Sequence, residues 1–491
     1  MAKNVDILLR ISAELFYRSD RIKMYMKSIG PGQTNENKQI VESIQKILED
    51  FEQVAKESIS FVKSSVLNGD KHIYEQAIQQ LYEDLGVFSK TFIGIHESLV
   101  YLPRRSVPIE AMYTIRQSFG STFVKDYDPS IILGSIFNAL EFDFLEILKN
   151  KLAPNLKGII QFDDSTKNII LQLPICDCDC PLSWSVLAHE MGHAIDFENS
   201  ISKSIVDEIV TSPEGPEYKI ISNWTCELCA DLIAAHAFGP SVMLSLVSME
   251  YCVHTWGGIW MPSESHPATK WRFKTVYNFL LNRYRNIEAL EILDAELSIY
   301  LKAWQDNFET HFPNEDDRNS YLEWEDDQLK KVIEPIAKLL QDKINNLGIK
   351  GHDINHQGIE RCIKRLKAKT PIAAQGLSRD VLRKEISKFE LEKSTVGEVE
   401  RIDKFKEMVA KFAETPMEMP TVMLSGFGAR KIIINDFVNC SSSEVSDKIK
   451  QMNKELSELD KVIVESVRGS TISMEELNRK NSNELHEETF A

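Results

Sequence analysis

The chain has 491 residues, and its 57 Lys and Arg against 74 Asp and Glu give a formal net charge of −17 at pH 7. With 43% hydrophobic and 27% charged residues, the composition is that of a globular protein and excludes wholesale disorder. The acidic balance argues against broad binding to nucleic acid or to anionic membranes, because such partners require Lys and Arg to offset phosphate charge. The length predicts two to four domains.

The cysteine content and the apolar stretches predict a cytoplasmic location. Eight cysteines in so long a chain are too few for a disulfide scaffold, which fits a reducing cytosol. The charged residues Lys3 and Asp6 interrupt the start of the chain before an apolar run long enough for the core of a signal peptide, so no export signal is expected. The best membrane candidate, 242–260, is interrupted by Glu250 and His254, so we predict a buried helix there and no membrane span.

Apolar residues at helical spacing predict a helical N-terminal region over residues 1–125. One stripe ends at the stop signal Asn68-Gly69, and a second follows it. The two stripes are Ile44, Ile47, Phe51, Val54, Phe61 and Val62, and then Ile73, Ala77, Leu81, Leu85 and Phe88. We interpret them as faces packed on the protein's own domain; the alternative is a coiled-coil surface for a protein partner.

The pattern changes in the central region, residues 126–285. Two short apolar runs, 158–162 and 168–173, flank a polar stretch and predict a β-hairpin that is closed at Pro174. A Cys-Asp-Cys-Asp-Cys loop then leads into a helix that begins near Ser183 or Trp184. A second helix spans roughly 218–238 and is stopped by Gly239-Pro240.

A third region, residues 286–491, returns to helical periodicity. One stripe runs from Leu329 to Leu347, with Pro335 as a possible kink. The run Ile432–Ile434 predicts a short strand, and a loose polar tail is expected from about Arg468. The expected fold is therefore mainly α, with a small α+β core between two helical regions.

The segment His189-Glu190-Met191-Gly192-His193 carries the clearest chemical signal. Residues four apart on a helix lie one turn above each other, so His189 and His193 can offer two imidazoles to one zinc ion. Glu190 sits beside the first ligand, where its carboxylate can accept a proton from a water that the zinc activates. Gly192 allows another backbone or the metal site to approach closely.

The second helix supplies a matching pair of acids, Glu227 and Asp231, which are also four apart. Glu227 can be the third zinc ligand, which leaves the fourth position open as in a catalytic site. Asp231 can accept the far ring N–H of a ligating histidine and fix its tautomer. The alternative is a solvated acidic face, but the helix is largely apolar and buried carboxylates need partners.

A third motif, Ser265-His266-Pro267-Ala268-Thr269-Lys270-Trp271-Arg272, makes the resemblance specific. The order HExxH, ExxAD and HPxxxxR resembles the gluzincin metallopeptidases, and most closely the HtpX and CAAX-prenyl endopeptidase family. The resemblance covers about residues 158–272. That family is embedded in membranes, whereas no spanning helix is expected here, so only the site chemistry is carried over.

The resemblance implies a role for each matching residue. His189, His193 and Glu227 match the zinc ligands of the family, Glu190 its general base and Asp231 the acid behind a ligand. His266 and Arg272 match residues near the bound peptide and its oxyanion. The alternative for the last two is structural: His266 caps the next helix, and Arg272 forms a salt bridge to Asp231 or another acid near the site.

These residues predict a zincin-like core and a zinc-dependent metallopeptidase that hydrolyses peptide bonds in a peptide or protein substrate. Glu190 takes a proton from the activated water and passes it to the leaving amine, while His266 or Arg272 stabilises the oxyanion. Residues 168–173 are the candidate edge strand for pairing with an extended substrate. The alternatives are a non-catalytic module with a structural zinc, and a zinc hydrolase of a non-peptide substrate.

Other metal-binding patterns are weaker. Cys176, Cys178 and Cys180 alternate in one loop and Cys226 and Cys229 flank Glu227, but buried free cysteines are common small hydrophobes. His352 and His356 are four apart without an adjacent Glu, which favours surface or capping histidines. The lone residues His236 and His254 lie in apolar helices and are expected to be structural.

Overall fold

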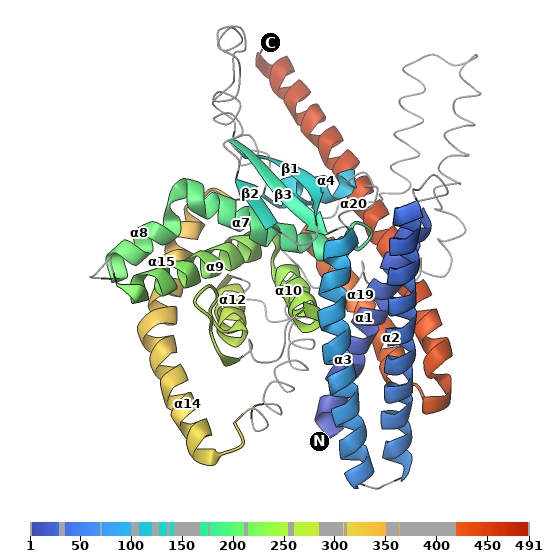
Figure 1. Ribbon diagram of the computed structural model, residues 1–491. Coiled ribbons are helices and arrows are strands. Elements are labelled where there is room, and N and C mark those ends of the chain that lie inside the picture. The colour runs from blue at the N-terminus through green and yellow to red at the C-terminus, as the bar shows by residue number, and fades with distance from the viewer. Residues whose placement is uncertain are drawn as a thin grey trace, which may run out of the picture.

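The computed structural model describes residues 2–28, 35–68, 71–99, 108–119, 127–134, 138–141, 167–174, 177–210, 215–253, 260–283, 308, 312–349, 363 and 419–489. The described part is mainly helical and carries one small sheet (Figure 1). The N-terminal and central helices are α1 (Ala2–Ser28), α2 (Asn35–Asn68), α3 (Lys71–Leu99), α4 (Ile109–Phe119), α7 (Val186–Asn199), α8 (Ile201–Ile209), α9 (Pro216–Phe238), α10 (Pro240–Val253) and α12 (Thr269–Arg283). The C-terminal helices are α14 (Glu315–Gln328), α15 (Glu334–Asn345), α19 (Met419–Val438) and α20 (Val445–Thr489).

Helices from the two ends of the chain pack together. α1 contacts α2 and α3 on one side and α19 and α20 on the other, as Figure 1 shows. The buried ion pair between Arg18 and Asp177, 3.3 Å long, ties α1 to the segment that leads into the central region. Buried apolar residues from all three regions form one hydrophobic cluster. The domain boundaries expected from the sequence stay a prediction.

The N-terminal helices follow the predicted stripes only in part. Ala77, Leu81, Leu85 and Phe88 are buried on α3, as expected. On α2, however, the three residues spaced seven apart, Ile47, Val54 and Phe61, are 38–43% exposed. These three residues lie on the outer flank of α2, whereas Ile44 and Val62 of the predicted stripe are buried together with residues that the prediction left out. The buried positions are Ile44, Leu48, Ala55, Ile59 and Val62.

The sheet has three strands in the order β1-β3-β2, from β1 (Tyr127–Gly134), β3 (Lys167–Pro174) and β2 (Asn138–Glu141). β3 pairs in parallel with β1 and antiparallel with β2, with Asn138 opposite Gln172. The predicted strand at 168–173 is confirmed, but β3 is central and has no edge to offer a substrate. The proposed edge role for residues 168–173 is therefore wrong. The run at 158–162 lies outside the described residues.

The predicted pair of central helices is confirmed. A short 3-10 turn, η2 (Pro181–Ser185), precedes α7, which packs against β2, β3 and α9. α7 ends where Ser200 adopts a left-handed φ of 50°, and Asp196 accepts hydrogen bonds from the backbone N–H (2.7 Å) and hydroxyl (2.5 Å) of Ser202. Because the chain turns at Ser200, α8 begins at the next residue. The connection from His193 to Glu227 therefore contains a helix.

The C-terminal region differs from expectation at two places. Leu329, Ile333 and Ile336 are buried as predicted, and a π-helical turn, η4 (Leu329–Ile333), lies just before Pro335. Ile432–Ile434, expected as a strand, lies inside α19, because so short an apolar run does not distinguish strand from buried helix. The prediction of a loose polar tail from about Arg468 is also wrong, because α20 continues as a helix to Thr489. A short 3-10 turn, η6 (Ser442–Glu444), precedes this helix.

No helix in the described part of the chain is long and apolar enough to cross a membrane. The stretch that came nearest by sequence begins as α10, in which Val242, Met243, Leu244 and Val247 are buried. α10 contacts α1, α7, α9 and α19, so its apolar residues face other helices.

Candidate metal centre

Helix α7 carries the two histidines one turn apart. Their Nε2 atoms lie 3.1 Å from each other, and the rings meet edge to face at an angle of 84°. His189 is 6% exposed, whereas the side chain of His193 is 29% exposed. The two imidazoles therefore converge on one point, from a buried side and from a more open side.

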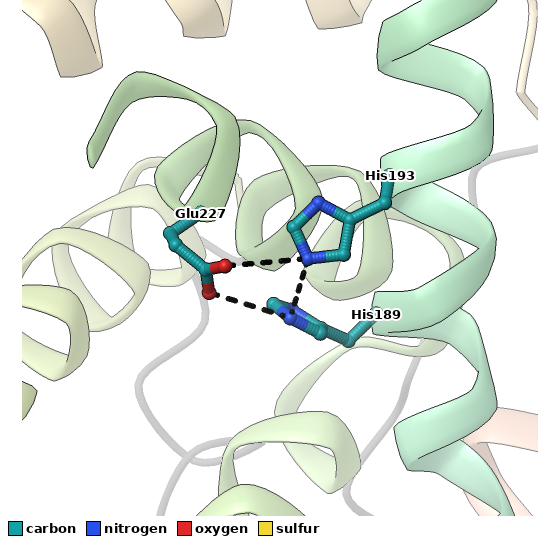
Figure 2. Close-up of side chains that lie close together, drawn as sticks. All are labelled: His189, His193 and Glu227. Atoms are coloured by element: carbon teal, nitrogen blue, oxygen red, sulfur yellow. Dashed lines mark hydrogen bonds and ion pairs between the residues drawn. The ribbon is translucent and has the colours of Figure 1, made fainter. Parts of the chain in front are cut away.

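Helix α9 crosses α7 closely enough to bring the third donor into place. A Cβ on Gly192 would lie 2.7 Å from both the Cα and the carbonyl oxygen of Ala230, so only glycine fits at this crossing. Glu227 then faces both histidines from the other helix (Figure 2). Its Oε2 lies 3.6 Å from Nε2 of His189, and its Oε1 lies 3.5 Å from Nε2 of His193.

These three side chains lie close enough together to hold one metal ion. Ligand atoms at about 2.0–2.2 Å from zinc in a tetrahedron lie about 3.3–3.6 Å from one another. Here the two imidazole Nε2 atoms are 3.1 Å apart, and they lie 3.6 and 3.5 Å from two different oxygens of the Glu227 carboxylate. Among the residues that the structure describes, His189, His193 and Glu227 form the one such group of metal-binding side chains. Two imidazoles and one carboxylate suit zinc and other divalent transition metals, so the donor set fits a metal without identifying it.

Asp231 and Arg272 form a buried layer behind the histidine. Asp231 Oδ1 lies 2.9 Å from Nδ1 of His189, as the sequence predicted for the acid behind a ligand. Arg272 donates from Nε to one oxygen of Asp231 (2.7 Å) and from Nη2 to the other (2.8 Å). The same Nη2 lies 3.3 Å from Oε2 of Glu227. Arg272, from α12, thus touches a ligand on the buried side of the cluster, where it forms the salt bridge considered as the structural alternative.

His266 lies on the opposite, open side. Its Nε2 is 3.4 Å from Oε1 of Glu227, and its side chain is 54% exposed. Its Nδ1 lies 2.8 Å from the hydroxyl of Ser265. The structure thus brings His266 and Arg272 to the same carboxylate from two sides.

The segment that carries His266 is anchored by residues that the sequence did not single out. Trp224 donates from its indole to the carbonyl of Ser263 (2.8 Å), and Asn223 donates to the carbonyl of Glu264 (3.0 Å). Both donors lie one turn before Glu227 on α9. Their position on that helix was the available signal, but only the fold reveals which segment lies opposite them.

Glu190 projects from α7 next to His189 and is half-buried. Its charge is one of those that act on the imidazole of His189. Between Val186 and Phe197, the positions of α7 that are not buried are Glu190, His193 and Phe197. Glu190 therefore belongs to the outward strip of the helix, together with the more open histidine.

Burial and neighbouring charges set the protonation of each candidate ligand in the cluster. Burial, followed by the charge of His189, lowers the pKa of His193 to about 4, so this ring is neutral and has a lone pair for a metal at pH 7. Burial alone would raise the pKa of Glu227, but the charges of Arg272 and of the histidines outweigh it, so the pKa of Glu227 is lowered. Burial alone would lower the pKa of His189, yet contact with Asp231 outweighs it and the pKa of His189 is raised.

The cysteines do not join this centre. Asp196 accepts hydrogen bonds from the thiols of Cys226 and Cys229, and burial raises the pKa of Cys226 to about 12 and that of Cys229 as well. Cys180 is buried with a pKa raised by burial to about 12. Protonated thiols are poor metal ligands and poor nucleophiles, so these cysteines have the character of small core residues. Cys176 lies outside the described residues.

Of the other histidines that the sequence analysis named, one lies in the described part of the chain and three do not. His236 is structural as expected: its Nε2 lies 3.3 Å from the carbonyl of Ile349 and its Nδ1 2.7 Å from Nη1 of Arg283. His254, His352 and His356 lie outside the described residues.

Neither a protein-family model nor a curated protein nor a solved structure matches this chain.

Proposed function

We propose that the protein is a zinc-dependent peptidase of gluzincin type with a zincin-like core. The observation that carries the proposal is the convergence of His189, His193 and Glu227 within the reach of one metal ion, with one side of the cluster exposed. A closed structural site would need a fourth protein ligand. Among the described residues, the donor group has three members, which favours a catalytic arrangement. The order of the three motifs, which resembles the gluzincins, points the same way.

His189, His193 and Glu227 would hold the ion, which would supply Lewis-acid polarisation of water and of the scissile carbonyl. Glu190 accepts a proton from the attacking water and gives it to the leaving amine. Its place on the outward strip of α7, beside His189 and half-buried, supports this role.

His266 stabilises the oxyanion, because its Nε2 lies on the exposed side of Glu227 where a substrate can reach it. Arg272 has a positioning role instead. Its Nε and Nη2 donors are engaged by Asp231 on the buried side, and through Asp231 it holds His189.

An extended substrate would pair with the edge strand β2. β2 is bonded to β3 on one side, has no second neighbour within the described ranges, and packs on α7. Backbone pairing of this kind tolerates varied side chains.

The test compares Glu190→Gln with His193→Ala. Glu190→Gln should abolish peptide cleavage while zinc content and thermal stability stay nearly unchanged, because Glu190 is a base and not a ligand. His193→Ala should lose both zinc and activity. Zinc content by mass spectrometry and cleavage of a peptide library supply the two readouts. If the protein binds zinc but shows no peptide cleavage that depends on Glu190, the peptidase proposal is wrong. The protein would then be a zinc-stabilised binding module or a hydrolase of another substrate class.

A further inference from the structure

The outward strip of α7 continues past the metal ligands to an exposed aromatic side chain. Phe197 lies four residues after His193, as His193 lies four after His189, so each is rotated about 40° from the last along the helix. At 1.5 Å per residue, Phe197 stands about 6 Å beyond His193 along the axis. It is 71% exposed, the highest value among the exposed large hydrophobic residues of the described chain.

Exposure alone means little, because single apolar residues are common on protein surfaces. The position of this residue is what matters. The cluster is closed on the side of His189, Asp231 and Arg272, whose side chains are 1–8% exposed. The cluster is open on the side of His193 and His266, whose side chains are 29% and 54% exposed. Phe197 lies on the outward strip of α7, one turn beyond His193, and so stands next to the open side of the cluster.

The C-terminal end of α7, which carries Phe197, is held by hydrogen bonds. α7 is fixed at its C-terminal end by the hydrogen bonds from Ser202 to Asp196, next to Phe197 in sequence. A phenyl group on a fixed helix loses little conformational entropy when a ligand covers it, and burial of its surface stabilises the complex.

We propose that Phe197 is a specificity-determining residue that contacts a large apolar side chain of the substrate next to the scissile bond. This inference rests on the proposed function, because the bound molecule is taken to be a peptide substrate, and the contact itself follows from the geometry of α7. The expected substrates are peptides with an aromatic or large aliphatic residue at that position.

The experiment uses the full-length, zinc-loaded protein and two hydroxamates that bind zinc through the same group. Acetohydroxamate carries only a methyl group, whereas 3-phenylpropionohydroxamate carries a phenyl side chain. Calorimetry gives the Kd of each. In the wild-type protein the phenyl compound should bind at least about 10-fold more tightly, the lower end of what an apolar contact contributes to discrimination.

Phe197→Ser should bring the ratio of the two Kd values close to one, with the Kd of acetohydroxamate and the zinc content unchanged. Phe197→Leu should keep most of the ratio. Leu322→Ser is the matched control, because Leu322 is also exposed, at 45%, but lies on α14 away from the cluster. A ratio that survives Phe197→Ser, or a wild-type ratio near one, would overturn the proposal.

Peptide cleavage separates this inference from the proposed function. If the wild-type protein cleaves peptides, Phe197→Ser should lower kcat/KM about 10-fold for peptides with Phe or Leu beside the scissile bond, and leave Ala peptides unaffected. If it cleaves none but retains the hydroxamate discrimination, the peptidase proposal fails and the apolar subsite stands. If neither hydroxamate binds, the metal has no accessible side and both proposals fall.

Discussion

At the scale of single residues, the pair Asp231–Arg272 decides how firmly His189 is held. Asp231 is fully buried, and both of its oxygens accept from Arg272. Burial alone would raise the pKa of Asp231, but the charge and hydrogen bonds of Arg272 outweigh it, so the pKa is lowered. The carboxylate is thus ionised at neutral pH and orients the imidazole from behind.

Asp231→Asn should therefore affect both metal binding and stability. We expect zinc affinity to fall about 10- to 100-fold, because the orienting acceptor behind His189 is lost. We also expect the free energy of unfolding of the metal-free protein to fall by about 3 kcal/mol, because the buried Arg272 loses the charge of its nearest partner. Chelator competition and urea denaturation measure the two quantities.

Glu325→Gln is the control for this variant. Glu325 is buried and accepts from Lys270 and Trp271, but it is not one of the metal-binding donors. This variant should lose stability and keep its zinc affinity. An affinity of Asp231→Asn within twofold of the wild type would contradict the orienting role.

The thiols beside Glu227 give a prediction about pH. Burial raises the pKa of Cys226 to about 12 from an ordinary value of 9. A group whose pKa is raised on folding contributes stability fully below its unfolded pKa, and this stability is lost as pH rises through the folded pKa. We expect the contribution of Cys226 to be intact up to about pH 9 and to be lost between about pH 9 and 12.

Iodoacetamide gives a direct check, because only the thiolate reacts. At pH 8.5 Cys226 and Cys229 should react at least about 100-fold more slowly in the folded protein than in urea. Peptide mapping locates the modified thiols. Rapid alkylation of the folded, zinc-free protein that zinc then blocks would instead indicate that these cysteines bind metal.

At the scale of elements, the crossing of α7 and α9 determines whether the ligands converge. The helical spacing of the two histidines and of Glu227 and Asp231 predicted both ligand-bearing faces, because a period of four residues is a local property. The sequence also suggested a close approach at Gly192. It left two roles open for Arg272, near the oxyanion or in a salt bridge to Asp231 or another acid near the site, because the choice between them depends on where α12 docks.

Gly192→Ala tests this crossing. The added Cβ would meet the backbone of Ala230 at 2.7 Å, and backbone cannot move aside as a flexible side chain does. We expect a loss of about 1–3 kcal/mol in the free energy of unfolding. Zinc affinity should fall as well, since the shift separates Glu227 from the histidines.

Gly86→Ala is the matched control on α3. Nothing lies within 4 Å of a Cβ at Gly86, so alanine should stabilise that helix by about 0.5–1 kcal/mol and leave zinc binding unchanged. Equal behaviour of the two variants would show that the α7–α9 contact is looser than described here.

The elements that the sequence misassigned share a physical cause. Ile432–Ile434 has the branched side chains typical of strands, but it lies in α19, where Ile434 is buried. Tertiary burial overrides the local preference. The strand 168–173 was identified correctly, but its central place in the sheet depends on β1 and β2, which pair with it from distant parts of the chain. Local patterns do not contain that information.

At the scale of the whole molecule, the flanking helices form a scaffold beside the candidate metal centre. α1 packs with α19 and α20, and α10 links this group to α7 and α9 (Figure 1). These contacts join segments more than 400 residues apart, such as Arg430 of α19 and Glu14 of α1, which form an ion pair. Periodicity predicted the helices, but it could not predict which of them pack together.

The central claim is that one metal ion is held between α7 and α9, and anomalous diffraction from crystals of the zinc-loaded protein tests it most directly. Data collected above and below the zinc absorption edge locate the ion independently of any assumed ligand. The account predicts one strong peak per chain, at about 2.0–2.2 Å from Nε2 of His189, Nε2 of His193 and a carboxylate oxygen of Glu227. No peak at these donors, or a zinc ion bound elsewhere on the chain with this cluster empty, would contradict it.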